Sequence, residues 1–147
     1  MVRTRPRTRS LLMASLPHEL VVLVLALVLF FVQLGLQGML ATRELGSAWN
    51  AGPRDGDRKP AGVHAGRAQR ALDNFKETFP VFLALALALV TTDRDGGLGS
   101  VGAWIWLLAR IAYVPLYLAG IPYIRSLVWL GSIVGLGLMG LRLLLLV

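Results

Sequence analysis

The chain has 147 residues, 56% of them hydrophobic, and its 15 basic against 8 acidic residues give a formal net charge of +7. This length fits a single domain, but the apolar residues form long uncharged blocks, which excludes a water-soluble globular fold. The absence of cysteine excludes disulfides, thiolate metal sites and a cysteine nucleophile. Because the arginines flank apolar blocks and form no separate basic domain, the charge indicates membrane topology and not nucleic-acid binding.

The first expected element is a membrane-spanning helix at about residues 17–41. It contains Leu20 to Leu40, which carries no formal charge and is long enough to cross a bilayer. This run is longer than the apolar part of a signal peptide and lacks a clear cleavage site, so we expect it to be retained. The arginine-rich residues 1–16 have no apolar partner, which predicts a disordered extension. A translation start at Met13 in place of Met1 is an open alternative.

Residues 42–66 combine glycine and proline with charged side chains, a composition typical of an aqueous loop. A second span is expected at about residues 67–92. Its apolar part, Phe79 to Val90, is too short to cross a bilayer alone, so the helix must extend back through polar residues. Four of these share one helical face at i, i+3, i+4 and i+7: Arg70, Asp73, Asn74 and Glu77. Since ionisable groups at membrane depth are costly unless they face a protein interior or a wet cavity, this face predicts a functional site.

A third span is expected at about residues 100–119 and a fourth at about 126–147, joined by a short turn. The third carries a second polar face at i, i+3 and i+7, made of Arg110, Tyr113 and Tyr117. The fourth carries a G-x-x-x-G spacing at Gly131 and Gly135, which is typical of close helix packing in lipid. The fold class predicted is therefore an all-α, integral membrane four-helix bundle.

Four spans place the 42–66 loop and the turn before residue 126 on the same side of the membrane. Basic residues concentrate in and beside this loop, so the positive-inside rule favours a cytoplasmic loop. Arginines at the N-terminus oppose this assignment. We expect a multi-pass protein of a bacterial inner membrane, with the loop in the cytoplasm.

The two polar faces are expected to meet near the loop side, because the second span starts there and the third span ends there. Arginines bind carboxylates through paired hydrogen bonds, and a carboxylate accepts from an ammonium. This set of side chains therefore suits a small zwitterionic ligand with several carboxylates. Arg125 and Ser126, at the start of the last span, are expected beside it.

Two motifs carry a resemblance to a known family. The pattern R-A-x-x-N-x-x-E-x-x-P-x-F occupies residues 70–82, and A-R-x-x-Y-x-x-x-Y occupies residues 109–117. In these motifs, and in the order of its spans from about Leu16 to the C-terminus, the chain resembles the membrane-associated proteins in eicosanoid and glutathione metabolism (MAPEG). The resemblance implies a four-helix subunit of a homotrimer, with glutathione held between subunits at the cytoplasmic end.

The resemblance also implies residue roles. Glu77 would take the ammonium of glutathione and Arg70 a carboxylate, while Arg43, just after the first span, would reach the ligand of the neighbouring subunit. The implied catalytic pair is Arg125, which would stabilise the thiolate, and Ser126 beside it. The full set of implied glutathione contacts is Arg43, Arg70, Asn74, Glu77, Arg110, Tyr113 and Tyr117.

The function expected on this basis is a glutathione-dependent transferase or peroxidase that acts on apolar electrophiles or lipid hydroperoxides. A free thiol with a pKa near 8.5 is only about 3% thiolate at pH 7. Lowering that pKa to about 6.5 needs about 2.7 kcal/mol of stabilisation, which an arginine bonded to the sulfur could supply. Leu72 and Thr78 differ from residues of the leukotriene-forming members. They favour the alternative, a non-catalytic trimeric scaffold or lipid-binding homologue.

Each site residue also has a simpler interpretation. Glu77 could form a structural ion pair with Arg110 or Lys76, the tyrosines could be membrane-interface aromatics, and Arg125 could be a topology anchor. Asp73 and Lys76 are expected to be helix-surface or subunit-contact charges. The two histidines, His18 and His64, are isolated in the sequence, so we expect no metal site.

Overall fold

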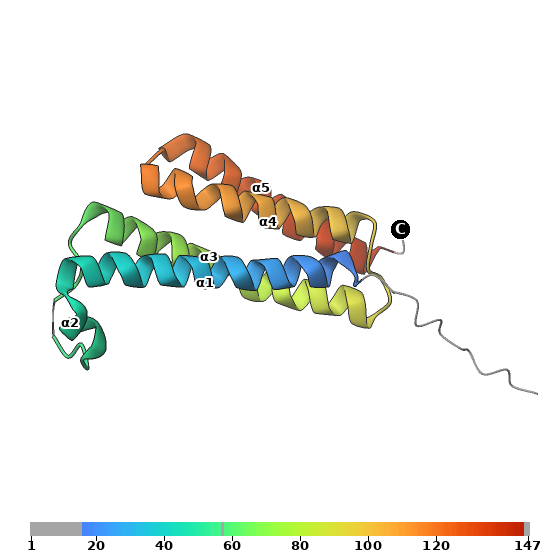
Figure 1. Cartoon of the computed structure of the whole chain (residues 1–147). Helices are drawn as coiled ribbons and strands as arrows, with labels where there is room; N and C mark the ends of the chain where they lie inside the picture. Colours follow the sequence, from blue (N-terminus) through green and yellow to red (C-terminus); the bar gives the residue numbers. More distant parts are fainter. Residues whose placement is uncertain (1–15, 57, 146–147) are drawn as a thin grey trace, which may run out of the picture.

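Four long helices run side by side and make up most of the computed structural model (Figure 1). The model describes residues 16–56 and 58–145, so the expected extension at 1–16 lies outside it except for Leu16. The helices are α1 (His18–Leu45), α2 (Ser47–Ala51), α3 (Val63–Thr91), α4 (Leu98–Ala119) and α5 (Pro122–Leu144). Every regular element in the described residues is a helix. The predicted all-α fold is confirmed.

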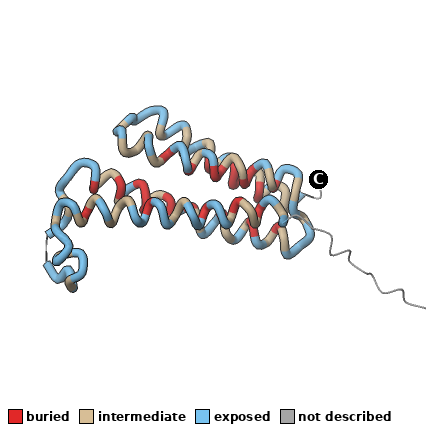
Figure 2. The backbone as a smooth tube through the Cα atoms, viewed as in Figure 1, coloured by how far each residue is buried: buried red, intermediate tan, exposed pale blue. Residues whose placement is uncertain are grey.

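The four long helices are each long and apolar enough to cross a membrane. Their outward sides carry large exposed apolar residues, such as Phe31 at 65% and Leu127 at 68% exposure. In Figure 2 the buried positions follow the sides where helices face one another, while the outer sides are exposed. A water-soluble domain rarely exposes so much contiguous apolar surface. The prediction of an integral, multi-pass membrane protein is confirmed.

Helix α1 runs four residues past its expected end, to Leu45. It stops at Gly46, whose φ of 88° lies in the left-handed region that glycine adopts without strain. The Gly46 N–H donates to the carbonyl of Thr42 at 2.8 Å. Arg43 is therefore in the last turn of α1, and the expectation that it follows the helix is wrong.

The connection from α1 to α3 is shorter than expected, because α3 already begins at Val63, and it contains the short helix α2. The carboxylate of Glu44 anchors the end of this connection, where the chain returns to the bundle. Glu44 Oε1 accepts the backbone N–H groups of Ala61 at 2.5 Å and Gly62 at 2.7 Å. The start of α3 is thereby fixed against the end of α1.

Helices α4 and α5 pack together most extensively. Gly102 of α4 and Gly135 of α5 lie against each other, and a Cβ on either would collide with the carbonyl oxygen of the other. Gly131, the other member of the expected G-x-x-x-G pair, has nothing within 4 Å of its Cβ position. The close approach therefore rests on one glycine of that pair and on a glycine of α4.

An aromatic core lies between α3 and α4. The rings of Phe82 and Trp106 stack at 4.1 Å between centroids, and Phe75 packs 5.7 Å from Trp106. All three side chains are at most 1% exposed. This core fixes the rotation of α3 relative to α4. It therefore determines which polar residues of the two helices face each other nearer the loop end.

Candidate functional site

Polar side chains of α3 and α4 meet between the aromatic core and the loop end. Arg110 Nη1 donates to Asn74 Oδ1 at 2.6 Å, and Asn74 Nδ2 donates to Glu77 Oε2 at 3.3 Å. The structure thus brings together three of the residues that the sequence placed on two facing helices. The amide of Asn74 lies between the guanidinium and the carboxylate and bonds to both.

Arg110 is the buried member of this group, at 2% exposure. A buried cation is costly unless its donors are satisfied. The hydroxyl of Ser132 on α5 accepts from Arg110 Nη2 and donates in turn to the carbonyl of Trp129 at 2.6 Å. The guanidinium carbon also lies 5.5 Å from the ring centroid of Tyr113. Ser132 was missed by sequence reasoning, although it is the one hydroxyl or charged residue of α5 between Ser126 and Arg142.

Two further arginines meet on one tyrosine. Arg70 Nε donates to the Tyr117 hydroxyl at 3.2 Å. The guanidinium carbon of Arg125 lies 4.3 Å from the centroid of the Tyr117 ring, a cation–π distance. The rings of Tyr113 and Tyr117 are 5.4 Å apart. Cations from α3 and α5 are therefore held close together by Tyr117 of α4, with Tyr113 packed beside it.

A cavity of about 160 Å³ opens beside this group. Its walls come from α3, α4 and α5, namely Asn74, Tyr113, Arg125, Ser126 and Trp129. Small-molecule pockets usually span about 300–1,000 Å³, so this cavity in one chain accommodates only part of a peptide-sized ligand. Trp129 was not predicted as a lining residue. The feature of the sequence that pointed to Trp129 was its position one helical turn beyond Arg125 and Ser126.

Arg125 and Ser126 lie inside α5 and not in a turn that precedes it. The helix begins at Pro122, a residue favoured in the first turn because it lacks the N–H that would be left without a partner there. The Ser126 hydroxyl donates to the Pro122 carbonyl at 3.2 Å. The expected start of this helix at residue 126 is four residues too late.

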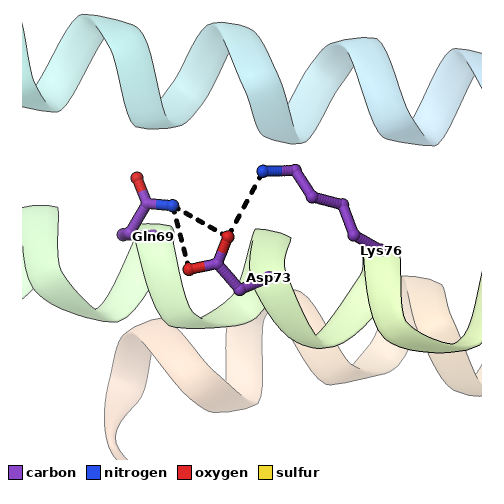
Figure 3. Close-up of polar contacts among 3 residues, drawn as sticks. All are labelled: Gln69, Asp73 and Lys76. Atoms are coloured by element: carbon purple, nitrogen blue, oxygen red, sulfur yellow. Dashed lines mark hydrogen bonds and ion pairs between the residues drawn. The ribbon is translucent and has the colours of Figure 1, made fainter.

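Asp73 does not belong with the other polar residues of its helix. Its carboxylate accepts both bonds from Gln69 Nε2 at 2.9 Å and pairs with Lys76 Nζ at 3.2 Å. In Figure 3 these three side chains gather on the side of α3 that faces a second helix, the cyan and blue α1. The expectation that Asp73 shares the site face is wrong, and its alternative role as a helix-surface charge holds.

The ion pairs proposed as simpler roles for Glu77 are not present. Among the described residues the one ion pair within 4.0 Å is Lys76 with Asp73, so Glu77 pairs with neither Arg110 nor Lys76. Arg43 lies apart from the site, in a separate cavity of about 260 Å³ that Glu44 and His64 also line. The part of the chain that the structure describes contains no cluster of three or more metal-ligating side chains.

Comparison with known proteins gives one clear result. A model described as the MAPEG family matches residues 22–145, whereas a search of curated proteins finds no match. Members of that family are glutathione-dependent transferases or peroxidases, or are non-catalytic. The match reaches into all four long helices and includes every site residue described above. The chain therefore belongs to the MAPEG family.

Proposed function

We propose that the protein is a membrane-embedded, glutathione-dependent transferase or peroxidase that acts on apolar electrophiles or lipid hydroperoxides. The observation that carries this proposal is the pair of arginines, Arg70 and Arg125, held on Tyr117 next to the Asn74–Glu77 pair. Cations beside a carboxylate fit a ligand with carboxylates and an ammonium. Glutathione is such a ligand, and MAPEG proteins generally use it.

Each residue then has a role that its position allows. Arg70 binds a carboxylate of glutathione and Glu77 binds its ammonium, with Asn74 setting the direction of Glu77. Arg110 is a positioning residue, because it is buried and its contact is with Asn74. Tyr113 packs against Arg110 and Tyr117 packs against Arg125. The two tyrosines therefore fix where the ligand lies relative to α4.

The reacting end belongs at the cavity lined by Arg125 and Ser126. Bound glutathione supplies a thiol that replaces a leaving group on an apolar electrophile, or reduces a hydroperoxide to an alcohol and water as two glutathiones become the disulfide. Arg125 stabilises the thiolate by charge and by hydrogen bonding, and the Ser126 hydroxyl can donate to it only by turning away from the Pro122 carbonyl. The exposed apolar sides of the helices let a lipid-soluble substrate approach from the bilayer.

The site needs more than one chain, and we propose a homotrimer. The 160 Å³ cavity is small for the whole ligand. Arg43 lies apart from it within its own chain, a position that leaves it available to a neighbouring subunit's ligand. We further propose a bacterial inner membrane with the α1–α3 connection in the cytoplasm, since that connection and its flanks are rich in basic residues.

A second candidate is a non-catalytic homologue whose polar group only fastens helices together. The observation in its favour is that Arg110, Asn74, Glu77 and Ser132 already bond to one another within the chain. A structural polar network has this arrangement.

A conjugation assay tests the catalytic proposal. The purified protein in detergent should conjugate glutathione to an apolar aryl halide such as chlorodinitrobenzene. Arg125→Ala should lower kcat by about 10²-fold, because a fixed donor at the developing charge is typically worth that much. Arg58→Ala, which removes a loop arginine outside the site, is the matched control and should retain activity. Conjugation that is unchanged by Arg125→Ala removes Arg125 from the mechanism.

A further inference from the structure

A second, larger cavity adjoins the glutathione site and shares Arg70 with it. It measures about 400 Å³ and lies between the end of α1, the α1–α3 connection and the start of α3. Figure 1 shows this connection, with α2, projecting to one side of the bundle at the end where α1 stops. The cavity residues that matter for its chemistry are Gln37, Trp49, Arg54, Lys59, Gln69 and Arg70.

The walls of this cavity are strongly cationic. Among the residues that the structure describes, 16–56 and 58–145, the lining includes three basic side chains, Arg54, Lys59 and Arg70, and no carboxylate. The nearby Asp73 is already paired with Lys76 at 3.2 Å and bonded to Gln69 Nε2 at 2.9 Å. The amides of Gln37 and Gln69 add polar groups that can bond to hydroxyls. A cavity with this charge selects an anion.

The cationic walls are held in place by contacts of the protein itself. The guanidinium carbon of Arg54 lies 4.9 Å from the centroid of the Trp49 ring, and its Nη2 donates to the Asn50 carbonyl at 3.0 Å. Arg54 also has a φ of 60°, an uncommon conformation for a residue with a side chain. Lys59 precedes Pro60 and the backbone of Ala61 and Gly62, whose N–H groups donate to Glu44.

The cavity lies at the level of lipid headgroups. The apolar run of α1 ends beside it, at Leu40, and the apolar part of α3 begins at Phe79, about two and a half turns beyond Arg70. Tryptophan is enriched at this level of membrane proteins, and Trp49 lines the cavity. Exposed apolar side chains of α1 and α3, Met39 at 45% and Val63 at 62%, lie near in sequence to the lining residues. Acyl chains could follow this surface while a headgroup occupies the cavity.

We propose that this cavity binds the phosphate-bearing headgroup of an anionic phospholipid. Arg54 and Lys59 pair with the phosphate, Gln37 and Gln69 bond to headgroup hydroxyls, and Trp49 packs against the glycerol region. Basic residues at a membrane surface attract anionic lipid in this way. The residues assigned to the lipid phosphate and glycerol, Arg54, Lys59 and Trp49, are not part of the glutathione site, although Arg70 lines both.

Native mass spectrometry of the detergent-solubilised protein tests this proposal. Phosphatidylglycerol and phosphatidylcholine are titrated against the wild type, Arg54→Ala, Lys59→Ala and the control Arg58→Ala, which removes the neighbouring cation that does not line the cavity. Phosphatidylglycerol should bind about tenfold more tightly than phosphatidylcholine, and each of the two cavity variants should weaken it roughly fivefold. Arg58→Ala should change its affinity less than about twofold. An unchanged Tm in detergent shows that the variants are folded.

Three results would overturn the proposal. Equal binding of the two lipids would show that the cavity does not select charge. An effect of Arg58→Ala as large as that of Lys59→Ala would show a diffuse basic surface instead of a site. Glycerol phosphate or inorganic phosphate that binds as tightly as phosphatidylglycerol would identify a site for free phosphate and not for lipid.

Discussion

Arg110 shows how this protein holds a cation inside the bilayer. Its guanidinium is bonded to Asn74 on α3 and to Ser132 on α5, so one side chain ties three helices together. Its Nε has no partner among the described residues. The stability of the bundle should therefore be sensitive to the remaining acceptors, since these bonds and the Tyr113 ring offset the desolvation cost of the cation.

Replacement of Ser132 by alanine should destabilise the protein. The change removes the hydroxyl that accepts from Arg110 and leaves a buried donor without a partner, which costs about 1–3 kcal/mol of unfolding free energy. Ser126→Ala is the control, because that hydroxyl is exposed and bonds only to its own helix. Thermal unfolding in detergent should show a lower Tm for Ser132→Ala than for Ser126→Ala. Equal Tm values would mean that Ser132 does not hold Arg110.

At the level of helices, the approach of α4 to α5 depends on glycine at particular positions. A Cβ at Gly135 would lie 2.6 Å from the Gly102 carbonyl oxygen and 2.9 Å from the Trp106 nitrogen. These are backbone atoms, which cannot move without separating the helices. Arg70 on α3 and Arg125 on α5 both pack on Tyr117 of α4, so a shift between α4 and α5 would also disturb the contacts of this tyrosine.

Gly135→Ala and Gly131→Ala should have opposite effects on stability. The first introduces the collision and should lower the free energy of unfolding by about 1–3 kcal/mol. The second has open space at its Cβ position and should raise stability by up to about 0.8 kcal/mol, because alanine favours helix over glycine. Chemical or thermal unfolding of the two variants measures the difference. Destabilisation by both would indicate that Gly131 packs against another subunit.

The sequence predicted the four long helices because long uncharged runs separated by charged, glycine-rich segments admit few other interpretations. It also placed Asn74, Glu77 and Arg110 together correctly, since both helical faces had to lie near the same end. It did not predict the start of α5 at Pro122, although proline is a known signal for a first helical turn. Ser132 and Gly102 could not be predicted, because their roles depend on how α4 and α5 rotate against each other.

Asp73 shows why a shared face in the sequence is not a shared site. It lies at the edge of the polar face of α3, and from there its carboxylate turns toward Gln69 and Lys76 beside α1. Asn74, one residue later, turns toward α4. A wide polar face of α3 contacts two different helices, α1 and α4. Which polar residue contacts which helix depends on how the helices pack.

The whole molecule should be a trimer in which a site is completed by a second subunit. Mass measurement of the detergent-solubilised protein under native conditions should give three copies. Arg43→Ala should weaken glutathione binding roughly tenfold without changing this mass, since a charged hydrogen bond contributes about 1.5–3 kcal/mol. Lys59→Ala, a loop cation outside the glutathione site, is the control. A monomer that binds glutathione with full affinity after Arg43→Ala would rule out the shared site.

The most direct test of the account is calorimetric titration of glutathione into the wild-type protein, Glu77→Gln and Asp73→Asn. Both variants exchange a carboxylate for an amide on the same helix, but only Glu77 is part of the site. We expect binding by the wild type, a loss of roughly ten- to a hundredfold in Glu77→Gln, and less than about a twofold change in Asp73→Asn. No heat of binding in the wild type, or equal losses in the two variants, would contradict it.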